Sequence, residues 1–420
     1  MSRGLTAEGV EALDKALARH VDRGDLPGLV ALAARGDDVH VAAIGHKAFG
    51  DAEPIGRDAI FRIASVSKPI AGAAAMLLIQ DGAMALDDAV RRWLPELAEP
   101  RVLRSLESGL DDTVPAERPI TVEDVLSFHL GFGSIMTPGP YPIQRAEQEL
   151  GLKTLGPPWP PADLTPAQWI AALGRLPLLD QPGTRWRYNT GATVAGVLIE
   201  RVADAPLAEV LRERVFQPLG MADTGFWVPP AKRHRFTTFY APDRDGLRVL
   251  DRPDGWWAAP PKLPDASSSL VSTVDDLLAF ASMLAADGGG LLSAESVRLM
   301  TTDRMTAAER AENRVFVGDR SGWGLMMLVP AGGNGQPGGP GQAGQPGIPG
   351  TPGIPGIPGI PGTPGIPGGF GWDGGSGTSW RTDTGSGLTG ILLTQRMMTS
   401  PVPTELVRDF WAAAYAAIDG

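Results

Sequence analysis

Residues 61–69 read FRIASVSKP, a short apolar run that leads into a segment typical of a helix start. Ser65 and Lys68 are three positions apart, so a helix places both side chains on one face. There the ammonium group can approach the serine oxygen, and the positive end of the helix dipole also favours an alkoxide. The pattern therefore indicates a serine nucleophile. A capping serine with a surface lysine has the same spacing, and Ser67 is a rival nucleophile on a different side of the helix.

A second polar segment holds Tyr188, one of four tyrosines in the chain. It follows a Pro-Gly turn and precedes a helix-like stretch, so we expect it in a loop at a helix start. A phenolate near two cations can act as a general base at neutral pH, and Arg185 and Arg187 flank this tyrosine. An ordinary half-buried tyrosine is the simpler alternative.

A third segment, residues 371–380, reads GWDGGSGTSW. A glycine-rich strand at the edge of a sheet lets a substrate approach the backbone closely, and its N–H groups can donate to an oxyanion. A plain turn and strand with aromatic packing is the alternative interpretation of these residues.

The remaining sequence predicts an α+β fold. A helix capped by Thr6 precedes a hairpin formed by residues 29–34 and 39–44, and strands are expected at 323–329, 378–383 and 389–394. A last helix runs from residue 403. The ends of the chain thus predict a discontinuous α/β sheet domain made of residues 1–82 and 255–420, and residues 83–254 predict a mostly helical domain.

A low-complexity insert occupies residues 335–369, where 14 glycines and 10 prolines fill 24 of 35 positions. Glycine recurs at every third position from Gly335 to Gly368, which is a collagen-like pattern. If the strands on either side are neighbours in one sheet, the ends of the insert lie close together, and a straight triple helix cannot connect them. We therefore expect a mobile loop, with a trimerising triple helix as the alternative.

The composition excludes several classes of protein. The 420 residues contain no cysteine, so disulfides, Cys-ligated metals and a Cys nucleophile are excluded. The net charge of −11 argues against nucleic acid as a main partner. No signal peptide or membrane-spanning run is visible, so we expect a cytoplasmic location. No His/Asp/Glu cluster has metal-ligand spacing, and no Gly-x-Ser-x-Gly motif is present, so a metal enzyme and a Ser-His-Asp hydrolase are disfavoured.

The three motifs, in this order, resemble those of the serine β-lactamase-related family, which includes class C β-lactamases, D-alanyl-D-alanine carboxypeptidases and family VIII carboxylesterases. Residues 86–90, 93–97, 218–226 and 270–276 add to the likeness, which covers nearly the whole chain except the insert. The resemblance implies a β-lactamase/transpeptidase-like fold: an antiparallel sheet flanked by helices, a mostly helical domain beside it, and the active site in the cleft between them.

The resemblance also implies roles for single residues. Ser65 and Lys68 match the Ser-x-x-Lys motif as nucleophile and partner, and Tyr188 matches the first residue of the Tyr-x-Asn motif. The backbone N–H groups of Ser65 and Gly375 would form the oxyanion hole. No metal and no organic cofactor is implied.

Two departures from the family motifs bear on the substrate. Thr190 stands at the third position of Tyr-x-Asn, and Trp372-Asp373-Gly374 replaces Lys-Thr-Gly on the edge strand. The replaced lysine normally helps to hold a substrate carboxylate, whereas a tryptophan gives an apolar wall that suits an uncharged ester. Trp372, Gly374 and Thr190 are thus expected to contact the substrate. Arg381 is a possible substitute anchor for a carboxylate.

These residues together predict a serine hydrolase that cleaves small carboxylic esters through an acyl-enzyme on Ser65. In this hypothesis Tyr188, kept partly ionised by Lys68, takes the serine proton. The expected partner is a small-molecule ester or amide. Two alternatives stay open: a β-lactamase or D-amino-acid peptidase of the same family, and an inactive scaffold that assembles through the Gly-X-Y segment.

Overall fold

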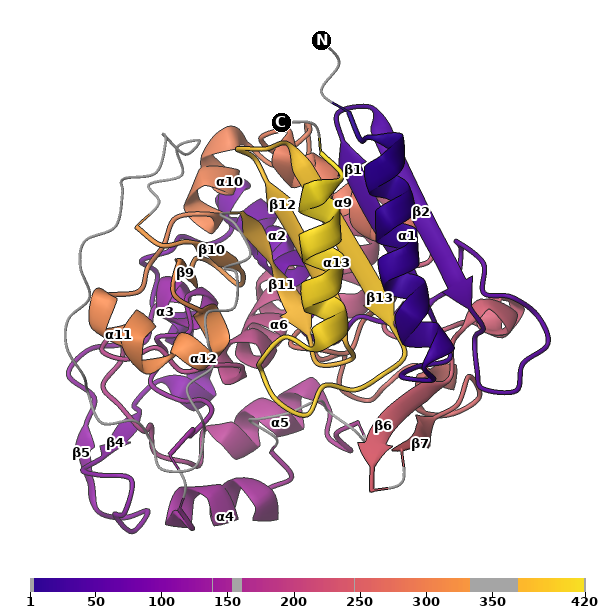
Figure 1. Ribbon diagram of the computed structural model, residues 1–420. Coiled ribbons are helices and arrows are strands. Elements are labelled where there is room, and N and C mark those ends of the chain that lie inside the picture. The colour runs from indigo at the N-terminus through magenta and orange to yellow at the C-terminus, as the bar shows by residue number, and fades with distance from the viewer. Residues whose placement is uncertain (1–3, 138, 153–160, 245, 333–368, 419–420) are drawn as a thin grey trace, which may run out of the picture.

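The computed structural model describes residues 4–137, 139–152, 161–244, 246–332 and 369–418. Its centre is a seven-stranded antiparallel sheet with the strand order β2-β1-β13-β12-β11-β10-β9 (Figure 1). The strands of this sheet are β1 (Gly28–Arg35), β2 (Asp38–Gly45), β9 (Ser321–Trp323), β10 (Leu328–Pro330), β11 (Phe370–Gly374), β12 (Thr378–Asp383) and β13 (Leu388–Thr394). The two ends of the chain therefore build one sheet, because β1 pairs directly with β13.

The first and last helices cover one face of this sheet. Helices α1 (Ala7–Asp22) and α13 (Glu405–Ala416) lie side by side across it (Figure 1). The Thr6 side chain caps α1, as the sequence predicts, by accepting a hydrogen bond from the Gly9 N–H at 3.0 Å. Alternate residues of β1, among them Leu29 and Ala31, join the apolar core beneath these two helices.

The opposite face of the sheet carries the larger core. Here lie α2 (Ser67–Gln80), α6 (Thr190–Ala203) and α9 (Val274–Ala285). Val30 and Leu32, which alternate with the residues of the first core, belong to this second one. Because helices cover both faces, every residue of β1 is buried, whereas β2 at the edge is mostly exposed or half-buried.

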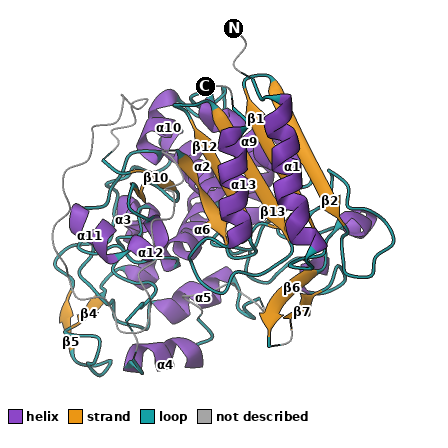
Figure 2. Ribbon diagram, viewed as in Figure 1, coloured by secondary structure: helices purple, strands orange, loops and turns teal. Residues whose placement is uncertain are grey.

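The remaining helices are drawn in purple with the others in Figure 2. They are α3 (Val122–Leu126), α4 (Pro142–Glu149), α5 (Pro166–Leu173), α7 (Leu207–Leu211), α8 (Gln217–Leu219), α10 (Ala294–Met300), α11 (Ala307–Glu312) and α12 (Arg314–Val317). Three two-stranded sheets pair β3 (Phe61–Arg62) with β8 (Val271–Ser272), β4 (Arg101–Leu103) with β5 (Thr113–Pro115), and β6 (Phe239–Asp243) with β7 (Gly246–Asp251). The α+β architecture agrees with the sequence, and the division into two domains stays a prediction.

One predicted strand is wrong. Residues 323–329 form a tight hairpin between β9 and β10 and not a single strand. The chain reverses at Met326, which has a left-handed φ of 67°, and the Gly324 N–H donates to the Met327 carbonyl at 2.9 Å. A reversal without a proline or an Asn-Gly pair carries no strong turn signal in the sequence.

The predicted insert, residues 335–369, lies outside the described residues except for Gly369. The strands that flank it are neighbours, because Leu328 of β10 pairs with Gly371 of β11. The ends of the insert therefore lie close together, as the prediction of a loop requires. The loop and the triple helix both stay predictions. Within the described ranges, no helix combines the length and the apolar character needed to cross a membrane.

Candidate active site

Ser65 lies in a single turn of 3-10 helix, η1 (Ala64–Val66), between β3 and α2. Ala64 just before it has a φ of 42°, a strained conformation for a residue with a side chain. The Ser67 side chain locks this turn, because its Oγ donates to the Ala64 carbonyl at 2.6 Å and accepts from the Leu270 N–H at 3.2 Å. Ser67 is fully buried, and its hydroxyl is engaged in these two hydrogen bonds, whereas Ser65 is half-buried. The geometry therefore favours Ser65 as the nucleophile.

Lys68 reaches Ser65 along the first turn of α2. Its Nζ donates to Ser65 Oγ at 2.8 Å and to the Ser267 carbonyl at 2.7 Å. The side chain is completely buried, and burial lowers the pKa of Lys68 to about 7 because a charged amine is costly away from water. At neutral pH a substantial fraction of Lys68 is therefore an uncharged amine with a free lone pair.

Tyr188 approaches the same oxygen from the turn that precedes α6. Its hydroxyl donates to Ser65 Oγ at 3.0 Å, and the Lys68 Nζ lies 4.8 Å from the centre of its ring. Burial raises the pKa of Tyr188 to about 12, since the phenolate would lose its hydration. The sequence-based expectation of a partly ionised phenolate is therefore wrong: this tyrosine holds its proton at neutral pH.

The two arginines beside Tyr188 do not supply the expected cations. Arg185 pairs with Glu312, and Arg187 pairs with Asp180. Neither donates to the Tyr188 hydroxyl, whose other partner is Trp372. Both guanidinium groups instead face carboxylates.

Strand β11 brings Trp372 to the hydroxyl of Tyr188. The Trp372 Nε1 donates to the Tyr188 hydroxyl at 2.9 Å, and its side chain is 5% exposed. The strand is not the sheet edge predicted from the sequence, because β10 and β9 lie beyond it. However, among the described residues β10 pairs with β11 only at Gly371, so from Trp372 onward β11 is paired there only with β12 on its other side.

The glycines after Trp372 allow a close approach to the chain before Ser65. A Cβ on Gly374 would lie 2.3 Å from the Ile63 carbonyl, so no larger residue fits there without a shift. The turn after Gly374 is fastened to the same backbone, because Ser376 Oγ donates to the Arg62 carbonyl at 2.6 Å. A Cβ on Gly375, in contrast, would meet open space.

Thr190 does not join the hydrogen bonds around Ser65. It is the first residue of α6, and its side chain is 1% exposed. In the described part of the chain its Oγ1 has no hydrogen-bond partner. The predicted substrate contact of Thr190 therefore stays a prediction.

Arg381 is not free to hold a substrate carboxylate. Its Nη2 donates to Asp373 Oδ2 at 2.8 Å, and its Nη1 donates to the Trp380 carbonyl at 2.7 Å. Ser379 Oγ donates to the other carboxylate oxygen of Asp373 at 2.6 Å. The guanidinium charge is thus balanced inside the protein.

Sequence reasoning missed the aromatic surroundings of Tyr188. Five rings lie with their centres 4.6 to 6.2 Å from its own, and Phe316 of α12 is stacked on it at the shortest of these distances. These rings are Phe128, Trp186, Phe316, Trp323 and Trp372. Phe316 is half-buried, and it belongs to a four-residue helix without a periodic pattern that could have indicated a role.

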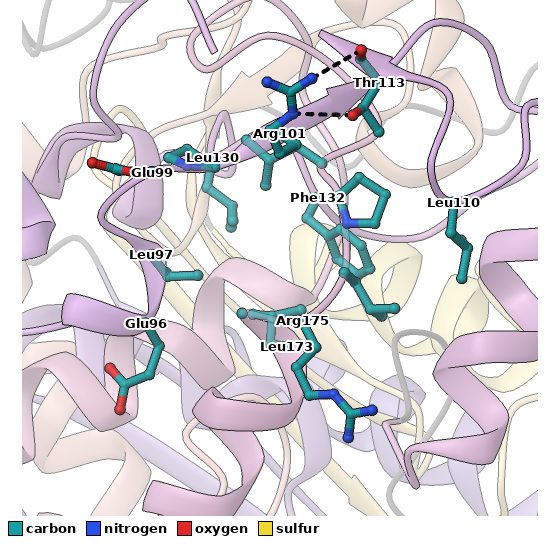
Figure 3. A pocket seen from close by; sticks show the side chains of 15 residues that line it. Glu96, Leu97, Glu99, Arg101, Leu110, Thr113, Leu130, Phe132, Leu173 and Arg175 are labelled. Carbon is teal, nitrogen blue, oxygen red and sulfur yellow. Dashed lines mark hydrogen bonds between the residues drawn. The ribbon is translucent and has the colours of Figure 1, made fainter. Parts of the chain in front are cut away.

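A separate pocket lies among η3 (Pro95–Leu97), β4, β5 and the end of α5 (Figure 3). Leu97, Leu130 and Phe132 form part of its apolar lining, and Arg101 is held by hydrogen bonds to Thr113. None of the predicted site residues lines this pocket, so it does not contribute to the group around Ser65.

Comparison with known proteins agrees with this geometry. The family model described as Beta-lactamase matches residues 13–412. Protein Rv1367c of Mycobacterium tuberculosis is 40% identical over 298 residues, which make up 69% of this chain and 71% of that protein. Esterase EstB of Burkholderia gladioli is 31% identical over 286 residues, which make up 63% of this chain and 67% of EstB.

Among solved structures, EstCE1, described as a hydrolase with promiscuous acyltransferase activity, superposes with a TM-score of 0.73. It is 23% identical and covers 97% of this chain and 99% of its own. This likeness confirms the predicted β-lactamase/transpeptidase-like fold. A family match over nearly the whole length, together with the group formed by Ser65, Lys68 and Tyr188, leads to one conclusion: the chain belongs to the Beta-lactamase family.

Proposed function

We propose that the protein is a serine hydrolase that cleaves carboxylic esters with uncharged acyl groups through an acyl-enzyme on Ser65. One observation carries the proposal: Ser65 Oγ accepts hydrogen bonds from both Lys68 Nζ and the Tyr188 hydroxyl, which itself accepts from Trp372. A serine oxygen between an amine of lowered pKa and a neutral phenol has a base on one side and an acid on the other.

Lys68 is the base of acylation in this proposal. In its neutral form the amine has a lone pair, so the direction of the 2.8 Å contact reverses: Ser65 Oγ donates to Lys68 Nζ and passes its proton to it while Oγ attacks the ester carbonyl. The pKa of about 7 matches this role, because a base is most effective near the working pH. Tyr188 cannot be the first acceptor, since its hydroxyl oxygen already carries a proton at neutral pH.

The oxyanion of the tetrahedral intermediate would be held by the backbone N–H groups of Ser65 and Gly375, each worth roughly 3 kcal/mol. Tyr188 then gives its proton to the leaving alkoxide and regains one from the Lys68 ammonium, so that the alcohol leaves neutral. Water attacks the acyl-enzyme and gives a proton to the same pair of residues. The acid is released as Ser65 regains its proton, and no metal or organic cofactor takes part.

The proposed substrate class rests on the charge and the apolar character of the side chains around Ser65 and Tyr188. Trp372 gives an apolar surface where a lysine would attract a carboxylate, and the charge of Arg381 is balanced by Asp373. Phe316 adds a second aromatic surface over Tyr188. These observations favour an uncharged ester over a β-lactam or a peptide with a free carboxylate.

Acyl transfer to an alcohol is a second candidate function. The observation that favours it is the likeness to EstCE1, whose description includes promiscuous acyltransferase activity. The acyl-enzyme is the same, and an alcohol replaces water in the second half of the reaction. Adding an alcohol acceptor and measuring the new ester against the free acid separates the two outcomes.

Turnover of p-nitrophenyl acetate and butyrate, measured beside a chromogenic cephalosporin, tests the proposal. We expect the wild-type protein to hydrolyse the esters, Ser65→Ala to lose this activity, and cephalosporin cleavage to be slight. Dominant cephalosporin cleavage would identify a β-lactamase instead. Ester hydrolysis that persists at the wild-type rate in Ser65→Ala would refute a Ser65 nucleophile. If the wild type turns over neither substrate above the level of Ser65→Ala, the proposal fails in favour of a peptidase of narrow specificity or the inactive scaffold.

A further inference from the structure

A buried turn that contains one aspartate, Asp265, contacts Lys68. Residues 265–269 read DASSS, and all five are buried. The carbonyl of Ser267 in this turn accepts the hydrogen bond from Lys68 Nζ at 2.7 Å. The direction of that carbonyl therefore helps to decide where the amine points relative to Ser65.

Asp265 fixes the direction of this carbonyl. Its Oδ1 accepts from the Ser267 N–H at 2.9 Å, and its Oδ2 accepts from Ser267 Oγ at 2.7 Å. Thr193 of α6 adds a third hydrogen bond, from Oγ1 to Asp265 Oδ1 at 2.8 Å. Two bonds to one residue and one to a neighbouring helix leave Ser267 little freedom to rotate.

The two buried charges of this region lack direct partners. Among the residues that the structure describes, Lys68 forms no ion pair, and its contacts are a hydroxyl, a carbonyl and an aromatic ring. Asp265 is 9% exposed, and within the described residues its carboxylate accepts hydrogen bonds from hydroxyl and N–H groups. Since a buried charge is costly unless an opposite charge compensates it, the negative charge of Asp265 favours the charged form of Lys68.

We propose that Asp265 is a positioning residue for the reaction: through Ser267 it aims Lys68 at Ser65, and its negative charge sets how readily Lys68 gives up a proton. The electrostatic effect of Asp265 on Lys68 acts against burial, which is the larger influence. Without Asp265 the amine would be neutral over a wider pH range but less well held. The activity part of this inference rests on the proposed function, whereas the effect on Lys68 itself does not.

The other titratable groups near Ser65 do not replace Asp265. Tyr188, before α6, holds its proton and faces Lys68 with its ring. Asp373 of β11 is paired with Arg381. Both groups stay the same in a variant at position 265, so a change in the titration of Lys68 reports on Asp265.

The test is a direct titration of Lys68 by NMR, with lysine labelled with ¹³C at the ε carbon. The chain contains six lysines, so the spectrum is simple, and the Lys68 signal is the one that disappears in Lys68→Arg. Asp265→Asn removes the charge but keeps a carbonyl oxygen for the Ser267 N–H and the Thr193 hydroxyl. If this variant does not fold, Asp265→Ser takes its place, because its hydroxyl still reaches a hydrogen-bond partner.

Asp276→Asn is the matched control. Asp276 is also buried, and it accepts hydrogen bonds from the Asp223 N–H at 2.8 Å and from Thr224 Oγ1 at 2.7 Å. The control makes the same chemical change in a carboxylate whose hydrogen-bond partners, Asp223 and Thr224, do not contact Lys68. A general loss of stability on removing a buried charge would affect both variants.

We expect Asp265→Asn to lower the pKa of Lys68 by about one pH unit or more, and the control to leave it unchanged. The acidic limb of kcat/KM for a p-nitrophenyl ester should move to lower pH by the same amount. An unchanged or raised pKa of Lys68 in Asp265→Asn overturns the inference. A lowered pKa in a protein that hydrolyses no ester would leave the inference standing and refute the proposed function.

Discussion

Trp372 Nε1 donates a hydrogen bond of 2.9 Å to the hydroxyl of Tyr188. An indole N–H can only donate, so the single proton of the tyrosine hydroxyl must point elsewhere. Its other partner is Ser65 Oγ, at 3.0 Å. Trp372 therefore does more than form an apolar wall, since it orients the proton of Tyr188 toward the serine.

Replacing Trp372 with phenylalanine should lower kcat for p-nitrophenyl acetate by about tenfold, the effect of one lost hydrogen bond of about 1.4 kcal/mol. KM should change little, because the apolar ring is kept. The control is Trp380→Phe, which removes an indole N–H that donates to Thr382 Oγ1 at 3.2 Å. An equal loss in both variants would show that Trp372 acts through packing alone.

Tyr188→Phe should reduce kcat by about 10²–10⁴-fold, the usual contribution of a general acid or base. The fold should survive, because the ring keeps its stacking on Phe316 at 4.6 Å. Steady-state kinetics and circular dichroism together check both statements. Tyr240→Phe removes a hydroxyl that accepts from the Phe49 N–H and serves as the control. If Tyr188→Phe keeps half of the wild-type kcat, the hydroxyl has no part in proton transfer.

Phe316→Ala should change the acyl preference of the enzyme. The half-buried ring stacked on Tyr188 provides apolar contact for an acyl chain, and each buried methylene is worth about 0.8 kcal/mol. We expect kcat/KM for p-nitrophenyl hexanoate to fall several-fold more than kcat/KM for the acetate. Phe49→Ala, at a 48% exposed ring, is the control. The same loss for both esters would remove Phe316 from the acyl site.

Lys68 should make stability rise with pH. In the folded protein its pKa is lowered from 10.5 to about 7, so between these values the unfolded chain binds more protons than the folded one. The free energy of unfolding then increases with pH through this window. Thermal unfolding of the wild type and Lys68→Met from pH 6.5 to 9.5 measures the effect. The wild type should gain several degrees relative to the variant, and parallel curves would mean that Lys68 titrates normally.

The sequence predicted the members of the catalytic group but not their protonation. The motifs predict Ser65, Lys68 and Tyr188 as the catalytic group, and the structure joins these three by hydrogen bonds. Trp372 is predicted only as an apolar wall, and its hydrogen bond to Tyr188 comes from the structure alone. The charge states depend on burial, which comes from distant segments such as the turn at residue 267. The sequence therefore allows a phenolate, whereas the partial burial of Tyr188 raises the pKa of its hydroxyl and favours a neutral phenol.

Long-range partners explain the other differences. Ser267 is 199 positions from Lys68, and Phe316 is 128 positions from Tyr188, so no local pattern connects them. The hairpin at 28–45 was predictable because its polar turn lies between two apolar runs. The turn at Met326 was not, because the residues around it are apolar and the reversal depends on packing against the helices.

The most direct test of a Ser65 acyl-enzyme is intact mass measurement after rapid acid quenching with p-nitrophenyl butyrate, followed by peptide mapping. If Ser65 carries the acyl group, the wild type and Ser67→Ala each gain the mass of one butyryl group on the peptide that contains Ser65. Ser65→Ala should gain none. Butyrylation that persists in Ser65→Ala, or that maps to Ser67, would refute a Ser65 acyl-enzyme.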